Sequence, residues 1–388
     1  MIQQSQMRLN RCVNGVWDES VPGIKFDESG ASNYYHMYRQ MESQYPRGDI
    51  GAAKWSSIVE EIRHAGRTSS YDCIVGVSGG TDSCYLLHLI VERGLRPLAV
   101  TIDNGFSTDK AVSNIKKMTS SLGVDLETYV IDYEEMKDIL TSYLKSGLPW
   151  VDFPTDHAIK SVLYRTAKKE KVKHVLIGHD FRSEGTQPSE WTYGDSKQLT
   201  AVHKSHGARR LKTFPSMSYH EQLWLAYVRK IKAIYPFYHL EYFKSEAQAL
   251  LRKKYDWTYY GGHHHENVFT RFAITYWMKG KYGIDKRIIT LSAQILNGEV
   301  DRQSVLENLQ RPPNDADLME RDKDFILTKL NLTKEEFQQM WDIPMSSIYD
   351  YPSYKRFTER FAHLLLPLAK LVLPQLPSYF IQMSLRSR

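Results

Sequence analysis

The sequence predicts an α/β fold: a doubly wound parallel sheet, preceded by a small N-terminal segment and followed by a C-terminal helical domain. Three observations support this. Apolar, β-branched runs alternate with helix-compatible stretches between residues 54 and 215, as in strand–helix–strand units with parallel strands. A glycine loop joins the first of these runs to the helix after it. Polar clusters follow three of the runs, at the strand ends where parallel sheets bind ligands.

Apolar periodicity and turn residues define the individual elements. Strands are expected at residues 73–77, 97–102, 127–131 and 174–177, and helices at 55–64, 109–122, 133–145 and 158–170. Thr333 and Glu336 have the spacing of a capping box. They would begin the last of seven helices expected at residues 221–234, 245–254, 266–278, 287–297, 302–310, 321–330 and 334–341.

A chain of 388 residues is long enough for two or three domains with their own cores. We expect a tyrosine-rich docking segment at 1–53, an α/β domain at 54–215 and a mainly helical substrate or partner domain at 216–388. The net charge of +6 is spread along the chain, which suits anionic small ligands better than nucleic acid.

The cysteines and the chain ends bear on location. Cys12, Cys73 and Cys84 form no CxxC pair or disulfide framework, so a reducing cytoplasm is expected. The N-terminus lacks the apolar core of a signal peptide. Residues 361–381 are apolar but carry three prolines, which favours a packed helical tail over interfacial membrane contact or a transmembrane span.

The glycine loop runs from Ser78 to Ser83 with the sequence Ser-Gly-Gly-Thr-Asp-Ser. Gly79 and Gly80 let backbone N–H groups approach an anion, and the following helix N-terminus adds partial positive charge. The loop therefore looks built for phosphate, although a Walker ending is absent. An ordinary glycine turn is the alternative. Asp82 beside a triphosphate implies Mg²⁺, unless it merely favours the helix dipole.

Two other clusters lie at expected strand ends. Asp103 is a candidate for hydrogen bonding to a ribose or a base, and a turn-forming aspartate is the equal alternative. Gly178 and His179 are candidates for contact with phosphate or the reacting group, against a loop or capping histidine.

The C-terminal half contains Gly-Gly-His-His-His-Glu at residues 261–266. Three consecutive histidines cannot readily share one metal ion, because neighbouring side chains diverge on a helix and alternate on a strand. A helix start that carries His264, Glu266 and then Arg271 suits a polar substrate better. A surface helix start is the alternative.

These motifs resemble those of known families. The Ser78–Ser83 loop resembles the loop of the N-type ATP pyrophosphatases, the PP-loop or adenine nucleotide alpha hydrolase type. Between about Arg11 and Tyr351 the chain resembles the N-acetyl sugar amidotransferases of lipopolysaccharide O-antigen biosynthesis, the WbpG type. The motifs that carry this resemblance are Asp27-Glu28-x-Gly30, Gly178-His179, Glu184-Gly185, residues 211–215, Tyr259-Tyr260-Gly261-Gly262-x-His264-x-Glu266, residues 269–272 and residues 283–287.

The resemblance implies a reaction in which ATP adenylates the acetamido oxygen of a UDP-linked sugar and ammonia replaces it, giving an acetamidino group, AMP and pyrophosphate. It implies a glutaminase and a barrel subunit resembling those of imidazole glycerol phosphate synthase, with ammonia channelled between chains. It implies catalytic roles for Asp82, His179, His264 and Glu266. ATP would bind Ser78, Gly79, Gly80, Thr81, Asp82, Ser83, Asp103 and Gly178, with Mg²⁺ at Asp82, and the sugar would bind Lys212, Arg271, Lys286 and Arg287.

The chain departs from that family in two places. Leu9, Cys12, Ser32 and Tyr35 stand where relatives often carry two CxxC pairs, so no zinc is expected. His263 and His265 stand where the family usually has Lys and Tyr. Two alternatives stay open: a tRNA-thiolating enzyme of the same superfamily, which would need a cysteine pair and a concentrated basic face, and a non-catalytic subunit that docks the glutaminase.

Overall fold

The computed structural model describes residues 10–262, 264–364 and 367. Within them, five parallel strands form one sheet in the order β3-β2-β1-β4-β5. The chain runs outward from β1 to β3 and then returns to add β4 and β5 on the other side. The predicted α/β fold class is confirmed. The strands are β1 (Cys73–Gly76), β2 (Pro97–Asp103), β3 (Leu126–Val130), β4 (His174–Leu176) and β5 (Lys232–Ile234).

Helices cover both faces of the sheet because alternate strand residues point to opposite sides. Val75 packs on one face with α2 (Gly48–Gly66) and α3 (Thr81–Glu92). Its neighbour Ile74 packs on the other face with α6 (Phe153–Lys169). This arrangement is the doubly wound architecture expected from the sequence.

Among the remaining described helices, seven overlap their predicted positions, whereas those at 33–44, 181–184, 189–192, 196–206 and 355–360 were not predicted from the sequence. The predicted capping box is confirmed, since Thr333 accepts from the Glu336 backbone and Glu336 accepts from the Thr333 backbone. These helices are α1 (Asn33–Gln44), α4 (Asp109–Leu122), α5 (Tyr133–Leu144), α7 (Phe181–Glu184), α8 (Ser189–Thr192), α9 (Ser196–His206), α11 (Lys244–Tyr255), α13 (Arg287–Leu296), α14 (Arg302–Leu309), α15 (Ala316–Leu330), α16 (Lys334–Asp342) and α17 (Lys355–Arg360).

The structure corrects the predicted helix at 221–234. Helix α10 (Tyr219–Leu223) continues as a π-helix through Val228, and the strand β5 follows. Lys230 has a left-handed backbone with φ of 57°, which ends the helix and turns the chain. β5 is three residues long and pairs with β4, so its conformation comes from sheet pairing rather than from a local pattern.

A second correction concerns the predicted helix at 266–278. It begins two residues later, as α12 (Val268–Phe272), because the Asn267 side chain caps the Phe269 and Thr270 amides. The helix then widens into a π-helix over Ala273–Lys281.

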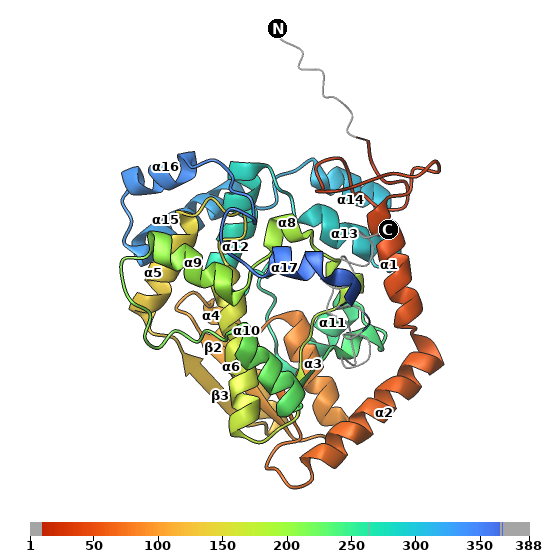
Figure 1. Cartoon of the computed structure of the whole chain (residues 1–388). Coiled ribbons are helices and arrows are strands. Elements are labelled where there is room, and N and C mark those ends of the chain that lie inside the picture. Colours follow the sequence, from red (N-terminus) through yellow and green to blue (C-terminus); the bar gives the residue numbers. More distant parts are fainter. Residues whose placement is uncertain (1–9, 263, 365–366, 368–388) are drawn as a thin grey trace.

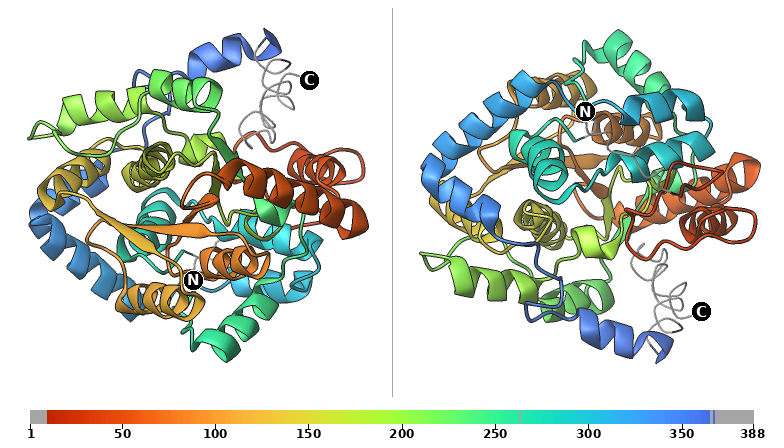
Figure 2. Two further views of the ribbon diagram at one scale, coloured as in Figure 1. Left: turned by 90° about the horizontal axis from the view of Figure 1, so that it is seen from below. Right: turned by 90° about the horizontal axis from the view of Figure 1, so that it is seen from above.

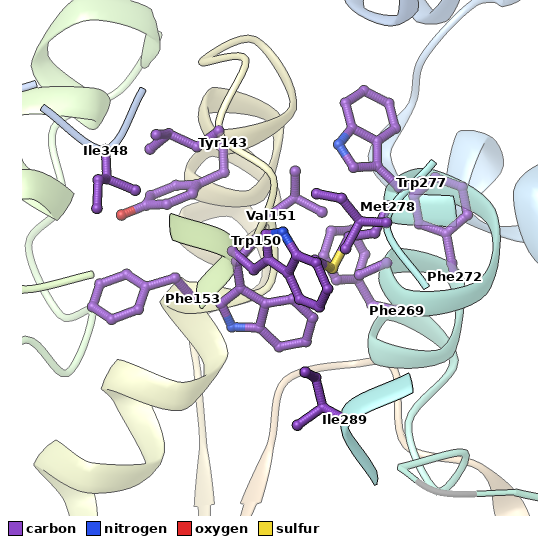
Figure 3. Close-up of a cluster of buried hydrophobic side chains, with 14 of the residues drawn as sticks. Tyr143, Trp150, Val151, Phe153, Phe269, Phe272, Trp277, Met278, Ile289 and Ile348 are labelled. Carbon is purple, nitrogen blue, oxygen red and sulfur yellow. The ribbon is translucent and has the colours of Figure 1, made fainter. Parts of the chain in front are cut away.

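The C-terminal helices lie above the carboxyl ends of the strands, and α1 and α2 run along one side (Figure 1). The views from below and above show the sheet enclosed between helical layers (Figure 2). A large hydrophobic cluster draws on all three predicted parts of the chain, including Tyr38, Tyr143 and Trp277. In Figure 3, Trp150 and Val151 lie between Tyr143 and Phe153 on one side and the aromatic side chains of α12 on the other.

The chain ends lie mainly outside the described residues. This applies to Leu9 and to almost all of the predicted tail at 361–381. No helix among the described residues is long and apolar enough to cross a membrane. Near the N-terminus, the Ser32 amide donates to the Cys12 sulfur at 3.2 Å, so two of the four positions compared with a zinc knuckle lie together. Within the described part of the chain, no three His, Cys, Asp or Glu side chains are grouped for a metal.

Phe269 tests how strongly the C-terminal helices are anchored to the sheet. Its ring is fully buried and lies 5.4 Å from that of Phe106, in the loop after β2. We expect Phe269→Ala to lower the free energy of unfolding in urea by about 3–5 kcal/mol, because the cavity left behind cannot collapse fully. Phe357→Ala, at a side chain 56% exposed, should cost less than about 1 kcal/mol. Equal losses would contradict this account of the core.

Candidate active site

A cavity of about 520 Å³ opens at the carboxyl ends of β1, β2 and β4. Parallel α/β sheets bind ligands at this edge, where the strand order reverses direction. Its walls combine the glycine loop, the end of β4, the start of α6 and the segment before α12. The polar residues at its wall include Ser78, Gly80, Asp82, Ser83, Asn104, Ser107, Asp156, Gly178, His179, Glu184, His264, Glu266, Asn267, Thr270 and Lys286.

The glycine loop has the geometry that its sequence predicts. Gly79 has φ of +80°, and a Cβ there would lie 2.3 Å from the Ala111 carbonyl oxygen. Only glycine fits this position. Asn114 and Trp257 side chains donate to the Gly79 carbonyl at 3.2 and 3.1 Å, which fixes the orientation of the peptide. Helix α3 starts at Thr81 with Gly80 as its N-cap, so the dipole of α3 points at the cavity.

A short backbone pairing places the C-terminal segment over this loop. Ser107 and Asn267 form an isolated antiparallel bridge. Beside it, the Thr108 amide donates to the Glu266 carbonyl at 2.9 Å, and the Val268 amide donates to the Phe106 carbonyl at 2.8 Å. The predicted site residue Glu266 is thereby held at the glycine loop, which lies far away in sequence.

Glu266 contacts the loop directly. Its Oε1 accepts from the Ser78 hydroxyl at 3.0 Å, and His264 Nδ1 lies 4.0 Å from the same oxygen. Oε2 is buried and has no hydrogen-bond donor among the described residues. Burial by itself would raise the pKa of Glu266, but His264 outweighs it and the pKa is lowered. The same pairing raises the pKa of His264 against the opposing effect of burial.

The predicted Mg²⁺ ligand, Asp82, already has two partners. Its Oδ2 pairs with Lys244 Nζ at 3.1 Å, and its Oδ1 accepts a hydrogen bond from the Tyr242 hydroxyl. Lys244 is the first residue of α11 and was not predicted as a site residue. Burial would lower its pKa, yet the carboxylates of Asp82 and Glu184 raise it. Nothing in its local sequence distinguishes Lys244 from other surface lysines.

His179 lies at the end of β4, as predicted, and its Nδ1 contacts Glu184 Oε2 at 2.5 Å. Burial opposes protonation of His179, but Glu184 prevails and the pKa of the imidazole is raised. Glu184 closes the short helix α7, whose N-cap is the fully buried Asp180. The Glu184-Gly185 motif was noticed in the sequence, although no site role was assigned to it.

Another part of the cavity wall is formed by the start of α6 and the residues before it. Trp150 Nε1 donates to Asp156 Oδ2 at 2.7 Å, and Lys286 Nζ lies 4.0 Å from the centre of the Trp150 ring. Thr270 donates to Asp152 Oδ2 at 2.5 Å. Burial lowers the pKa of Lys286 to about 8. Of these residues only Lys286 was predicted, because tryptophan and aspartate without a motif carry no sequence signal.

Six predicted ligand residues are absent from the cavity wall. Gly79 and Thr81 belong to the glycine loop itself but are buried, and the Thr81 amide donates to the Tyr260 hydroxyl at 3.1 Å. Asp103 accepts from the Gly105 amide at 2.8 Å, which matches the turn-forming alternative. Lys212 is exposed, and its amide donates to Glu135. Arg287 pairs with Asp285 at 2.7 Å. Arg271 pairs with Asp322 through two hydrogen bonds of 2.6 and 2.7 Å.

Arg271 and Asp322 form a buried pair that links α12 to α15. Arg271→Met should lower the free energy of unfolding by about 3–5 kcal/mol, because it leaves the Asp322 carboxylate buried and unpaired. Urea titration measures this change. Lys254→Met, which breaks an exposed pair with Glu92, should cost less than about 1 kcal/mol. Unchanged stability of Arg271→Met would contradict a structural role.

Asp152 should make stability depend on pH. Burial first, and Asp156 second, raise its pKa from 3.8 to about 7. The folded chain therefore keeps a proton that the unfolded chain loses between these values, so the free energy of unfolding falls as pH rises from 5 to 7. Asp152 alone contributes at most about 1.4 kcal/mol per pH unit to the slope of the unfolding free energy against pH. Asp152→Asn should flatten this dependence in urea titrations, and an unchanged slope would contradict it.

Comparison with known proteins extends these observations. Residues 266–365 match the family described as LPS biosynthesis protein WbpG-like, C-terminal domain. The chain is 30% identical over 133 residues to the uncharacterized protein MJ1599 of Methanocaldococcus jannaschii, covering 33% of this chain and 46% of that protein. It is 29% identical over 112 residues to tRNA-specific 2-thiouridylase MnmA 2 of Fusobacterium nucleatum, covering 27% and 33%.

The aligned segments thus span less than half the length of these curated relatives. Among solved structures, NMN synthetase from Francisella tularensis superposes with a TM-score of 0.31 at 12% identity, covering 77% of this chain and 98% of that chain. That likeness is too distant to bear on fold or activity. The match at residues 266–365 supports the predicted resemblance for the C-terminal part of the chain. It begins at Glu266 and includes the whole of α12.

Proposed function

We propose that this chain is an ATP-dependent amidotransferase, the synthetase subunit that converts an acetamido group of a nucleotide-linked sugar to an acetamidino group. The observation that carries the proposal is the meeting of two segments in one cavity. The Ser78–Ser83 loop has the form of a phosphate cradle, and Glu266, which touches it, begins the segment that matches the WbpG-like family. ATP binding, the sugar substrate and a role in lipopolysaccharide O-antigen biosynthesis are parts of this proposal.

The proposed chemistry proceeds in two displacements. The amide oxygen attacks the α-phosphorus of ATP, and the bond to the β-phosphate breaks with its electron pair leaving on pyrophosphate. Ammonia then forms a C–N bond to the amide carbon, and the C–O bond breaks with its electron pair leaving on AMP. Amide, ATP and ammonia thus give amidinium, AMP and pyrophosphate. An amide oxygen is a poor leaving group until it is adenylated, which is why ATP is needed.

The chain's own groups suit these steps. The α3 dipole would stabilise phosphate charge. The Gly80 and Thr81 amides would do so once released from the Ser78 and Tyr260 hydroxyls, to which they donate at 3.3 and 3.1 Å. Lys244, paired with Asp82 at 3.1 Å, places a cation beside the loop. The His179–Glu184 pair at 2.5 Å lies at the strand end beside the loop and would hold a proton near the phosphates. Lys286, which also lines the cavity, would contact the sugar.

Mg²⁺ fits one side of this site. Both oxygens of Asp82 are engaged by Tyr242 and Lys244, whereas Glu266 Oε2 is buried without a donor among the described residues. Carboxylate and phosphate oxygens are the ligands that Mg²⁺ prefers. Glu266 would therefore hold the ion, joined by Asp82 if Lys244 moves away. When bound, Mg²⁺ neutralises charge on the departing pyrophosphate.

Ammonia would come from a separate glutaminase. All three cysteines of the chain are buried, so none is placed as a nucleophile that hydrolyses glutamine. The proposed partners are a glutaminase and a barrel subunit resembling those of imidazole glycerol phosphate synthase, in the cytoplasm, with no nucleic acid involved. Peripheral contact with the membrane remains part of the same proposal.

The buried cysteines also weigh against tRNA thiolation, despite the partial match to a 2-thiouridylase. Thiolation needs an accessible thiolate or cluster ligand. Cys84 follows the loop directly, but it is buried and burial raises its pKa to about 12. The shape of the Ser78–Ser83 loop also favours an enzyme over a non-catalytic subunit that only docks the glutaminase.

Nucleotide products test the proposed function. With ATP, Mg²⁺, concentrated ammonium chloride and a UDP-linked acetamido sugar, we expect chromatography to detect AMP and mass spectrometry to detect replacement of oxygen by NH. Ser78→Ala and Asp82→Asn should lower AMP formation by about 100-fold or more, as expected when a charge-stabilising group is lost. Ser120→Ala, on the exposed face of α4, is the matched control. Release of ADP, or no nucleotide turnover with any such sugar, would overturn the proposal.

A further inference from the structure

We propose that Asp156, backed by Asp152, forms a subsite for a cationic nitrogen group: the ammonium that supplies nitrogen, or the amidinium formed from it. This assignment rests on the proposed conversion of an amide to an amidine. It places the nitrogen chemistry at the start of α6, in the same cavity as the glycine loop, and neither residue carried any sequence motif.

Charge pairing in the cavity singles out Asp156. Four carboxylates line the cavity. Three of them each have a basic partner among the described residues: Asp82 with Lys244 at 3.1 Å, Glu184 with His179 at 2.5 Å, and Glu266 with His264 at 4.0 Å. The Asp156 carboxylate forms no ion pair within 4.0 Å among the described residues, where its side-chain hydrogen bond comes from Trp150 at 2.7 Å.

The carboxyl group of Asp152, next to Asp156, also lacks a hydrogen-bond donor for one of its oxygens among the described residues. Asp152 lies one helical turn before Asp156, is 1% exposed, and accepts from Thr270 through Oδ2. Its Oδ1 is buried without a hydrogen-bond donor among the described residues. A buried carboxyl oxygen without a partner is costly. Asp156 is exposed and lines the cavity. A buried Asp152 oxygen without a donor next to this accessible carboxylate favours a shared proton or a bound cation.

Lys286 shows that this wall accommodates an ammonium group. Its Nζ lies over the Trp150 ring, 4.0 Å from the ring centre, rather than within ion-pair distance of either aspartate in the described structure. The ring edge of Trp150 meanwhile orients Asp156 through Nε1. Trp150 packs in the hydrophobic cluster (Figure 3), which holds its ring in place beside the Lys286 ammonium group and the Asp156 carboxylate.

The reaction makes such a subsite useful. It turns a neutral amide into a cationic amidinium, whose two N–H groups match one carboxylate as a charge-assisted pair. Preorganised negative charge stabilises this developing cation. If nitrogen arrives as ammonium, one proton must also leave before attack: the N–H electron pair stays on nitrogen, and the proton passes to a carboxylate. Burial raises the pKa of Asp152 to about 7, which suits a proton acceptor near neutral pH.

Ligand-induced shifts in Tm of the intact chain test the subsite without turnover. Acetamidinium chloride and ammonium chloride should raise the Tm of the wild-type protein more than potassium chloride at equal concentration. Both shifts should be lost in Asp156→Asn and Asp156→Ser, whereas Asp324→Asn, an exposed control on α15, should keep them. A shift with acetamidinium alone assigns the subsite to the amidinium, and one with ammonium alone assigns it to the nucleophile.

Two further measurements keep the outcomes distinct. A non-hydrolysable ATP analogue should bind Asp156→Asn as it binds wild type, because the cradle is separate. In turnover assays Asp156→Asn should raise the KM for ammonium about tenfold or more while leaving the KM for ATP unchanged. If the Asp156 variants lose the cation-induced shifts in Tm but the wild-type protein forms no AMP, the subsite is retained and the proposed function is rejected. Potassium chloride raising the Tm as much as the two nitrogen cations would overturn the subsite, as would Asp156→Asn showing the same shifts in Tm as wild type. If Asp156→Asn raised only the KM for the sugar, Asp156 would be reassigned to hydroxyl recognition.

Discussion

The site depends on the short backbone bridge between Ser107 and Asn267. This bridge ties the loop after β2 to the segment before α12, and it brings Glu266 within 3.0 Å of Ser78 although 188 positions separate them. Without it Glu266 would not be held at the glycine loop. The cavity is therefore made by two distant parts of one chain, and Phe269 packing on Phe106 stabilises the same junction from below.

Electrostatic pairing explains how so many acidic groups line a cavity suited to an anionic nucleotide. Asp82, Glu184 and Glu266 each have a basic neighbour, so their charges are compensated before any ligand enters. Such pairs are stable in a partly buried site only when each charge keeps its partner. The remaining acidic pair lies away from the cradle on α6, where an added positive charge would be favourable. The proposed phosphate cradle and the proposed cation subsite would thus use different groups of the cavity.

Several residues of the predicted site have structural partners instead. Arg271 pairs with Asp322 on α15, Arg287 pairs with Asp285 two residues before it, and Asp103 closes its own turn. The sequence alone does not show whether an arginine near an active site pairs with a buried carboxylate or binds an anionic ligand, because the guanidinium group suits both. Only the position of Asp322 and Asp285 in the fold separates them.

The sequence by itself determined the features that depend on local backbone geometry. The alternation of strands and helices, the glycine loop, the capping box at Thr333 and the placement of His179 at a strand end all follow from neighbouring residues. Tertiary structure alone decided β5, Lys244, Asp152 and Asp156. β5, Lys244 and Asp152 depend on partners in distant segments, which no short stretch of sequence contains. Asp156 bonds to the nearby Trp150, but its place on the cavity wall is set by the fold.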